Sequence, residues 1–377
     1  MAPRHAAKEE KSSGKARWIV GGLATVLVLG VVATLVVTTT SPPSSDHAST
    51  TGATKSFSVV TTTPSNNAVV DSSATVRVAM SEAISSTSPL PTISPEVAGS
   101  WQRLSPTTLE FVQTAPFSPG QNLTVTVPGG DQGITSTSGR KLSASATSTF
   151  SVAGMSLTRV QQLLAEENYL PVAFTPSVPT GSIAGTAEEL GTFSWRFSEF
   201  PQSLKDLWAP GAMTTVTKGA IMRFQDVHQM TTDGAVSPQL EAALLADRAA
   251  GKVDPNPYTW VLVHRALPQT LQLYSNGALD YTARVNLGIP GEDTPSGTWP
   301  VYLRYRTQTM SGTNPDGSHY EDPGVPFVSY FVGGVALHGF PRASYGSPQS
   351  LGCVEMTDPD AEHVWPLTPI GTIVNVD

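Results

Sequence analysis

Two residues near the C-terminus carry the side chains that nucleophilic catalysis needs, the thiol of Cys353 and the imidazole of His338. A thiol with its ordinary pKa of about 8.5 is mostly protonated at neutral pH, so it is a poor nucleophile until a neighbouring group takes its proton. A histidine within hydrogen-bonding distance does this. Cys353 is the only cysteine of the chain, which excludes an intramolecular disulfide.

The backbone around this pair suits the same chemistry. His338 stands on the apolar run VGGVALHG, which predicts a buried strand that ends at a loop. Gly352 lets the backbone approach a ligand closely. We expect the N–H groups of Gly352 and Cys353 to form an oxyanion hole. Thiol, base and backbone donors together are the groups needed for acyl transfer at an amide.

Each of the two residues also has a plain structural interpretation. A lone cysteine is often a small buried apolar residue, and a histidine on an apolar strand is often a satisfied core residue. A metal site is a weaker interpretation, because zinc takes about four ligands. The residues to be considered show no such ligand spacing: His319, His338, Cys353 and His363. We expect neither a metal nor a cofactor.

Composition places the chain among extracellular β-rich proteins. Its 377 residues suffice for two or three domains, only 14% of them are charged, and there are 32 glycines and 31 prolines. The formal net charge of −8, without a basic face after the N-terminus, argues against a nucleic-acid partner.

The N-terminus predicts attachment to a membrane. Residues 18–37 hold no charge, and about 20 such residues span a bilayer as a helix. Because the basic residues precede this stretch, we expect a cytoplasmic segment at 1–17 and an anchor at 18–38 in the lipid bilayer, with the rest of the chain on the cell-wall side. A cleaved signal peptide is the alternative. Residues 39–55 are a Ser/Thr/Pro linker.

Short alternating strands dominate residues 56–153. The stretches ATVRVAM and NLTVTV alternate apolar and polar residues, and Pro/Gly turns such as FSPGQ separate strands. This pattern predicts an antiparallel β-sandwich. The region resembles bacterial immunoglobulin-like modules, and we interpret it as a spacer.

The apolar period becomes helical within residues 154–252. Apolar residues fall on one helical face in two stretches, and Ser237-Pro238 marks the start of a further helix. Those residues are Leu157, Val160 and Leu164 in the first stretch, and Ile221, Phe224 and Val227 in the second. With Phe224-Gln225 and Asp233-Gly234, the region resembles the peptidoglycan-binding helical module. A small helical packing domain is an equally weighted alternative.

Residues 257–377 return to strands. Asn276-Gly277 predicts a hairpin turn, and Trp299, Val301 and Leu303 alternate along one predicted strand. Two further motifs follow in order and are separated by a loop: His338-Gly339, and the stretch from Ser350 to Met356 (SLGCVEM).

This last region resembles the L,D-transpeptidase catalytic domain. The family pattern has HG, a loop, then S-H-G-C, a hydrophobic residue and Arg or Asn. Its upstream TPxG turn is matched by residues 294–297, and its closing strand by residues 369–376. The resemblance implies a β-sandwich-like fold. The whole chain is therefore predicted to be mainly β, with the membrane helix, an Ig-like sandwich and a small helical domain before it.

The resemblance also implies a function. Cys353 attacks the bond after the third residue of a peptidoglycan tetrapeptide stem, and His338 activates the thiol. The carbonyl of Gly339 orients the imidazole, while Ser350 and Gly352 support the oxyanion site. An amine of a second stem then takes the acyl group, which makes a 3→3 cross-link, and carbapenems acylate such cysteines.

Two positions depart from the family pattern. Leu351 replaces its second histidine, and Glu355 replaces its Arg or Asn, which adds negative charge near the substrate. Tyr320, Tyr330, Leu351 and Glu355 are expected in the substrate pocket, and core packing is the alternative for at least one of the two tyrosines. Two alternatives stay open, an L,D-carboxypeptidase that uses water as the acceptor and a non-catalytic wall-binding protein with a degenerate domain.

Overall fold

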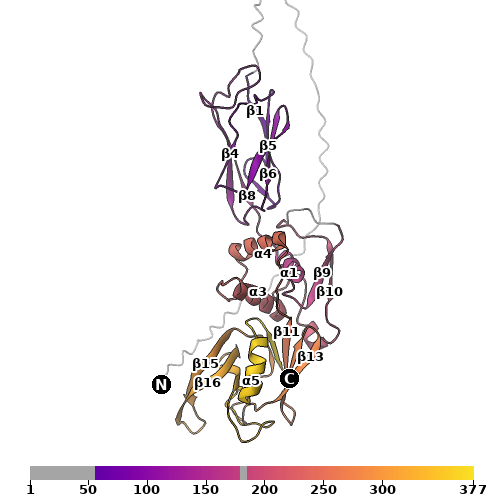
Figure 1. The fold of residues 1–377 in the computed structure, drawn as a ribbon, viewed down its shortest axis with the longest axis vertical. Helices are drawn as coiled ribbons and strands as arrows, with labels where there is room; N and C mark the ends of the chain where they lie inside the picture. The colour runs from indigo at the N-terminus through magenta and orange to yellow at the C-terminus, as the bar shows by residue number, and fades with distance from the viewer. Residues whose placement is uncertain (1–55, 179–184) are drawn as a thin grey trace, which may run out of the picture. The chain divides into compact units, whose positions relative to one another are not determined.

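The computed structural model describes residues 56–178 and 185–377 (Figure 1). The predicted cytoplasmic segment 1–17, membrane anchor 18–38 and linker 39–55 lie outside these residues. Within the described ranges, no helix combines the length and the apolar character needed to cross a membrane.

Two four-stranded sheets form the first β region. One sheet has the order β1 (Val59–Thr63), β3 (Val76–Met80), β6 (Thr108–Gln113), β5 (Gly99–Ser105), and the other has β2 (Ala68–Val70), β8 (Ala146–Val152), β7 (Asn122–Val127), β4 (Thr92–Ser94). The predicted alternation is confirmed in β3 and β7, where every second side chain is buried. These side chains from both sheets share one apolar core, as expected for a sandwich.

Helices follow, together with one hairpin. The elements are α1 (Leu157–Glu166), β9 (Val172–Pro176), β10 (Gly191–Trp195), α2 (Gln202–Lys205), α3 (Thr215–Val227) and α4 (Pro238–Ala250). Ser156, Thr214 and Ser237 cap α1, α3 and α4 by accepting a backbone N–H. The β9–β10 hairpin was not predicted. Val227, expected on the buried face of α3, is 40% exposed because it is the last residue of the helix.

The helical region packs directly on the C-terminal β region. Helix α3 contacts β14 and β19. The contact is close at Gly219, where an added Cβ would lie 2.6 Å from the carbonyl oxygen of Gly371. Arg223 of α3 also forms an ion pair with Asp254 at 2.9 Å. The region therefore has a packing role, and binding of peptidoglycan by it stays a prediction.

Two sheets build the C-terminal region. The first has the order β13 (Ala278–Arg284), β12 (Thr270–Ser275), β11 (Thr259–His264), β19 (Ile373–Val376), β14 (Gly297–Pro300), and the second has β15 (Leu303–Thr313), β16 (His319–Val332), β17 (Val335–Gly339), β18 (Val354–Met356). Helix α5 (Asp358–Val364) and the 3-10 turn η1 (Trp365–Leu367) follow β18. A shared apolar core includes residues of both sheets.

The predicted strand through Trp299, Val301 and Leu303 is in fact two strands. Trp299 belongs to β14 of the first sheet, whereas Leu303 begins β15 of the second. Val301, between the strands, is buried, but Leu303 is 37% exposed. Alternation alone does not reveal a chain that crosses from one sheet to another. The Asn276-Gly277 turn is confirmed, since both residues adopt positive φ between β12 and β13.

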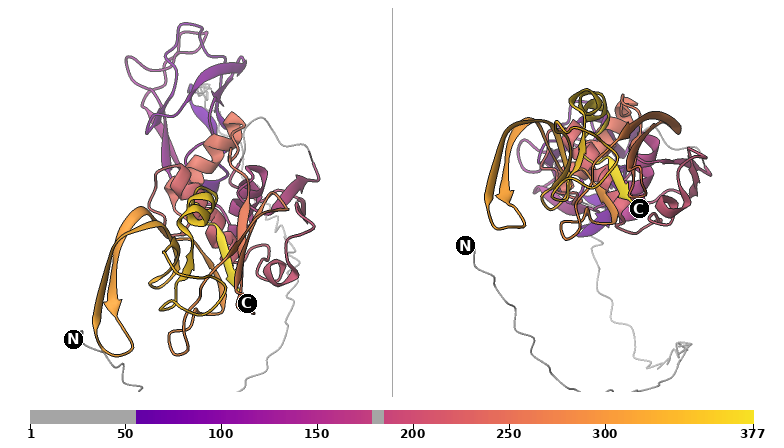
Figure 2. Two further views of the ribbon diagram at one scale, coloured as in Figure 1. Left: turned by 60° about the horizontal axis from the view of Figure 1, so that its bottom comes forward. Right: turned by 90° about the horizontal axis from the view of Figure 1, so that it is seen from below.

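A long hairpin extends from the second sheet. Strands β15 and β16 pair along their whole length, and the outer part of this orange hairpin stands out from the rest of the C-terminal region in both views of Figure 2. The register shifts between Gln308 and Met310, and Phe327 adopts a positive φ of 57°. Bulges of this kind bend a strand. Residues of the hairpin line one pocket together with His338, which lies near the end of β17.

One carboxylate in the helical region, that of Glu167, is buried without a hydrogen bond to its oxygens in the described part of the chain. Glu167, the C-cap residue of α1, is 1% exposed, and within the described residues neither of its carboxylate oxygens has a hydrogen-bond partner. Two neighbouring basic side chains form ion pairs with other carboxylates: Arg248 pairs with Glu166, and Lys252 pairs with Asp247. Burial, with the nearby charges of Asp247 and Glu166, raises the pKa of Glu167 to about 9. The folded protein therefore keeps this carboxyl neutral at pH 7.

This burial predicts a pH-dependent stability. The unfolded chain releases the Glu167 proton near pH 4.5 and the folded chain only near pH 9, so stability from this group is lost as pH rises between these values. Glu167→Gln cannot ionise. We expect its thermal midpoint to exceed that of the wild type at pH 8, by an equivalent of at most about 5 kcal/mol, and to match it much more closely at pH 5. An equal difference at both pH values in thermal melts would contradict the assignment.

Candidate active site

His338 lies near the end of β17 and is held in one tautomer. The side chain is 3% exposed, and its Nδ1 lies 3.0 Å from the carbonyl oxygen of Gly339. Because a carbonyl only accepts, Nδ1 carries the proton and Nε2 is free to act as a base. Burial lowers the pKa of His338, and the Gly339 bond and the charge of Glu355 oppose this effect. The imidazole is thus neutral and oriented at rest.

Cys353 directly precedes β18, opposite the middle of β17. Its Sγ lies 3.8 Å from the carbonyl oxygen of Gly334, which a thiol can donate to but a thiolate cannot. The N–H of Ala336 favours the thiolate, yet burial dominates and raises the pKa of Cys353 to about 11. The resting thiol is therefore protonated, and it needs a base before it can attack.

A tight turn presents the cysteine. Gly352 has φ = +109°, a conformation that side chains rarely adopt. Its N–H donates to Ser350 Oγ at 3.2 Å, and Ser350 Oγ donates to the carbonyl of Cys353 at 2.6 Å. Thr294 Oγ1 donates to the carbonyl of Gly352 at 2.9 Å. The Gly352 N–H, expected in an oxyanion hole, is therefore engaged within the turn at rest.

The charge of Glu355 is balanced by a residue of the intervening loop. Arg342 donates from Nε and Nη2 to the two carboxylate oxygens of Glu355, each at 2.8 Å. Its Nη2 also donates to the carbonyl of Gln349 at 3.2 Å, and its guanidinium stands over the ring of Phe340. The ion pair ties the loop to β18. The negative charge expected at this position does not stand alone.

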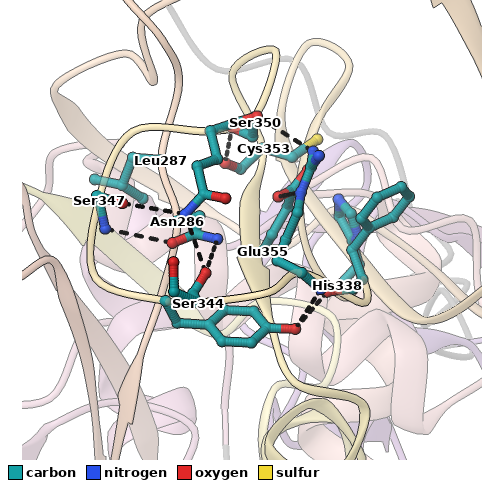
Figure 3. A network of polar contacts seen from close by, with 12 residues as sticks. Asn286, Leu287, His338, Ser344, Ser347, Ser350, Cys353 and Glu355 are labelled. Atoms are coloured by element: carbon teal, nitrogen blue, oxygen red, sulfur yellow. Dashed lines mark hydrogen bonds and ion pairs between the residues drawn. The ribbon is translucent and has the colours of Figure 1, made fainter.

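Asn286 fixes the other side of the same loop (Figure 3). Its backbone exchanges two hydrogen bonds with Glu355, and its side chain is fully buried. The side-chain amide donates to the carbonyl of Ser344 at 3.0 Å, and its oxygen accepts from the N–H groups of Gly346 and Ser347. A single amide group therefore holds three residues of the loop between the base and the thiol.

These elements enclose one pocket of ≈ 550 Å³, which His338 and Cys353 both line. The hairpin β15–β16 and the loop after β17 supply much of the rest, including Gln308, Tyr320, Asp322, Tyr330, Arg342 and Leu351. The pocket is lined by all four predicted pocket residues, Tyr320, Tyr330, Leu351 and Glu355. Gly339, Ser350 and Gly352 are not among its lining residues. Gly339 instead bonds the imidazole of His338, and Ser350 bonds Gly352 in the turn before Cys353. Tyr330 donates its hydroxyl to Gln308 at 3.0 Å.

Three supporting residues were not found from the sequence. They are Asn286, Arg342 and Thr294, the last of which is a partner of Gly352. Thr294 belonged to a recognised turn, but nothing in its position indicated a contact 58 residues away. Asn286 is a polar residue in the apolar run RVNLGIP, which was the available signal. Its partners could not be read from that run.

The Asn286 network predicts a local change. In Asn286→Ala, the amide proton of Ser347 loses its acceptor, and that of Gly346 keeps only the carbonyl of Val285, so hydrogen exchange should accelerate by about tenfold or more at Ser347 and by less at Gly346. The Gln349 amide, which donates to the carbonyl of Leu287, should change less. Asn314→Ala, in the hairpin turn, is the matched control. Unchanged exchange at Gly346 and Ser347 would contradict the assigned role.

The raised pKa of Cys353 predicts slow alkylation. At pH 7 we expect iodoacetamide to modify this thiol at least about tenfold more slowly than free cysteine, because the thiolate fraction is smaller. Since the pKa is about 11, the rate should still be rising above pH 9. Mass spectrometry of the intact protein measures it. A plateau below pH 8 would instead reveal a resting thiolate–imidazolium pair.

Two stretches of the chain match models of known protein families. Residues 258–376 match the model of the L,D-transpeptidase catalytic domain, and residues 53–152 match that of the bacterial Ig-like domain. A search of curated proteins finds no match.

Solved structures of L,D-transpeptidases are also similar. One from Mycobacterium smegmatis is 11% identical over 86% of this chain and 100% of its own, with a TM-score of 0.30. One from Mycobacterium tuberculosis is 13% identical over 85% of this chain and 97% of its own, with a TM-score of 0.29. The catalytic domain from E. faecium is 25% identical over 32% of this chain and 96% of its own, with a TM-score of 0.29. On the family models, the chain joins a bacterial Ig-like domain to an L,D-transpeptidase catalytic domain.

Proposed function

We propose that this protein is an L,D-transpeptidase that forms an acyl-enzyme on Cys353 and makes 3→3 cross-links between peptidoglycan stems. One observation carries the proposal. The thiol of Cys353 and the imidazole of His338, whose tautomer is fixed, line the same pocket of the catalytic domain. Peptide stems are the substrates that this family of domains implies. No cofactor enters the mechanism.

The proposed first half-reaction is acylation. The Cys353 proton moves to Nε2 of His338, and the thiolate attacks the carbonyl carbon of the third stem residue. Negative charge then develops on the carbonyl oxygen, toward which the N–H of Cys353 is the candidate donor. The C–N bond to the terminal D-alanine breaks, and the imidazolium gives its proton to that leaving amine. A thioester remains on Sγ.

The second half-reaction transfers the acyl group. An amine of a neighbouring stem loses a proton to His338 and attacks the thioester, the C–S bond breaks, and the imidazolium returns its proton to the sulfur to restore the thiol. Before acylation can begin, the Cys353 thiol must leave the carbonyl of Gly334, which is its hydrogen-bond partner at rest. A high resting pKa suits such a site, because it keeps the buried thiol protonated and unreactive until His338 takes its proton.

We further propose that residues 18–38 anchor the protein in the cell membrane, with residues 1–17 in the cytoplasm and the catalytic domain on the wall side. The support is the uncharged stretch and the basic residues before it. In this arrangement, the linker and the Ig-like domain hold the pocket away from the bilayer.

The test is to incubate the full-length protein with disaccharide tetrapeptide and to analyse the products by mass spectrometry. We expect a cross-linked dimer that lacks one D-alanine. His338→Ala should lower turnover at pH 7 by about 100-fold or more, because general-base catalysis contributes that much. Cys353→Ala should give no product. His363→Ala, which alters an exposed histidine of α5, is the control and should retain activity.

The other outcomes have distinct meanings. Release of free tripeptide without dimer would identify an L,D-carboxypeptidase. Identical spectra from wild type and Cys353→Ala, with no acylation of the thiol by a carbapenem, would overturn the enzymatic proposal in favour of a non-catalytic wall-binding protein.

A further inference from the structure

Glu355 stands beside the imidazole as a consequence of strand register. Strands β17 and β18 run parallel, and His338 is paired with Glu355. Paired residues on adjacent strands point to the same face and lie about 5 Å apart. Both side chains line the pocket, and Glu355 is only 5% exposed. A buried carboxylate is thus fixed next to the proposed base.

The carboxylate is held there by an ion pair with Arg342. Two hydrogen bonds from Arg342, each at 2.8 Å, stabilise its charged form. Arg342 is in turn placed by the carbonyl of Gln349 and the ring of Phe340. The pair therefore brings two opposite charges near the imidazole, and they act on it in opposite directions.

Other charged or titratable groups also face His338. Asp322 lines the pocket from β16, and its charge acts on His338 less strongly than that of Glu355. Tyr320 and Tyr330, on the same strand, stay neutral because burial raises the pKa of each. Cys353 is neutral at rest. Among the charges that act on His338, those of Glu355 and Arg342 are therefore the strongest, and they oppose one another.

We propose that Glu355 acts through His338, stabilising the imidazolium that forms when the imidazole takes the Cys353 proton, and that Arg342 limits the strength of this effect. The proposal rests on the proposed function for the identity of the proton donor. The proton passes from Sγ to Nε2 and then to the leaving amine, so Glu355 stays ionised throughout. A residue that departs from the family pattern thereby gains a role in the reaction.

This role predicts opposing shifts in the titration of His338. In Glu355→Gln, the pKa of His338 should fall by about one unit, because the nearest opposite charge is lost. In the double variant Glu355→Gln/Arg342→Gln, it should fall by less, since the opposing cation is lost too. The acid limb of the pH profile of kcat/KM should move in the same direction. Glu362→Gln removes an exposed carboxylate from α5 and should leave both unchanged.

The measurement is a nuclear magnetic resonance titration of the full-length protein labelled at histidine Cε1, with His338 assigned by the signal lost in His338→Gln. It needs no turnover, so it remains informative if no cross-link forms. A His338 midpoint in Glu355→Gln within about 0.2 units of the wild type would overturn the proposal. If Glu355→Gln does not fold, the double variant Glu355→Gln/Arg342→Gln provides the test, because it leaves no unpaired charge. A His338 midpoint in the double variant that equals or exceeds that of the wild type would overturn the proposal.

Discussion

The site depends on one structural constraint, the parallel pairing of β17 with β18. Parallel strands need a long connection between them, and here that connection contains the loop that Asn286 and Arg342 hold. The register then decides which side chains meet. It sets His338 beside Glu355 and leaves Cys353 at the entrance of β18, where the N–H of Ala336 reaches its sulfur. A slip of one residue would turn His338 away from this face.

Burial acts on both members of the pair in the same direction, toward the neutral form. It raises the pKa of Cys353 and lowers that of His338. The ion pair of thiolate and imidazolium is therefore disfavoured at rest, and groups that favour it must be supplied by the fold. The carbonyl of Gly339, the N–H of Ala336 and the carboxylate of Glu355 are such groups. Their placement follows from β17 and β18, not from a mobile loop.

Sequence reasoning succeeded where the information is local. Alternation predicted β3 and β7, Ser237-Pro238 predicted the start of α4, and Asn276-Gly277 predicted the turn after β12. The catalytic domain was also predicted, because its motifs occur in order along the chain. Such features need only a few neighbouring residues to be recognised.

It failed where partners are distant in sequence. The crossing from β14 to β15 leaves the alternation of Trp299, Val301 and Leu303 intact, so one strand was expected in place of two. The compensation of Glu355 illustrates the same limit. Read alone, that residue adds a negative charge to a peptide-binding pocket, whereas the fold brings Arg342 to it across the loop. A charge in a sequence therefore indicates function only once its partner is known, and here the partner changes Glu355 from an obstacle to substrate into a fixed neighbour of the base.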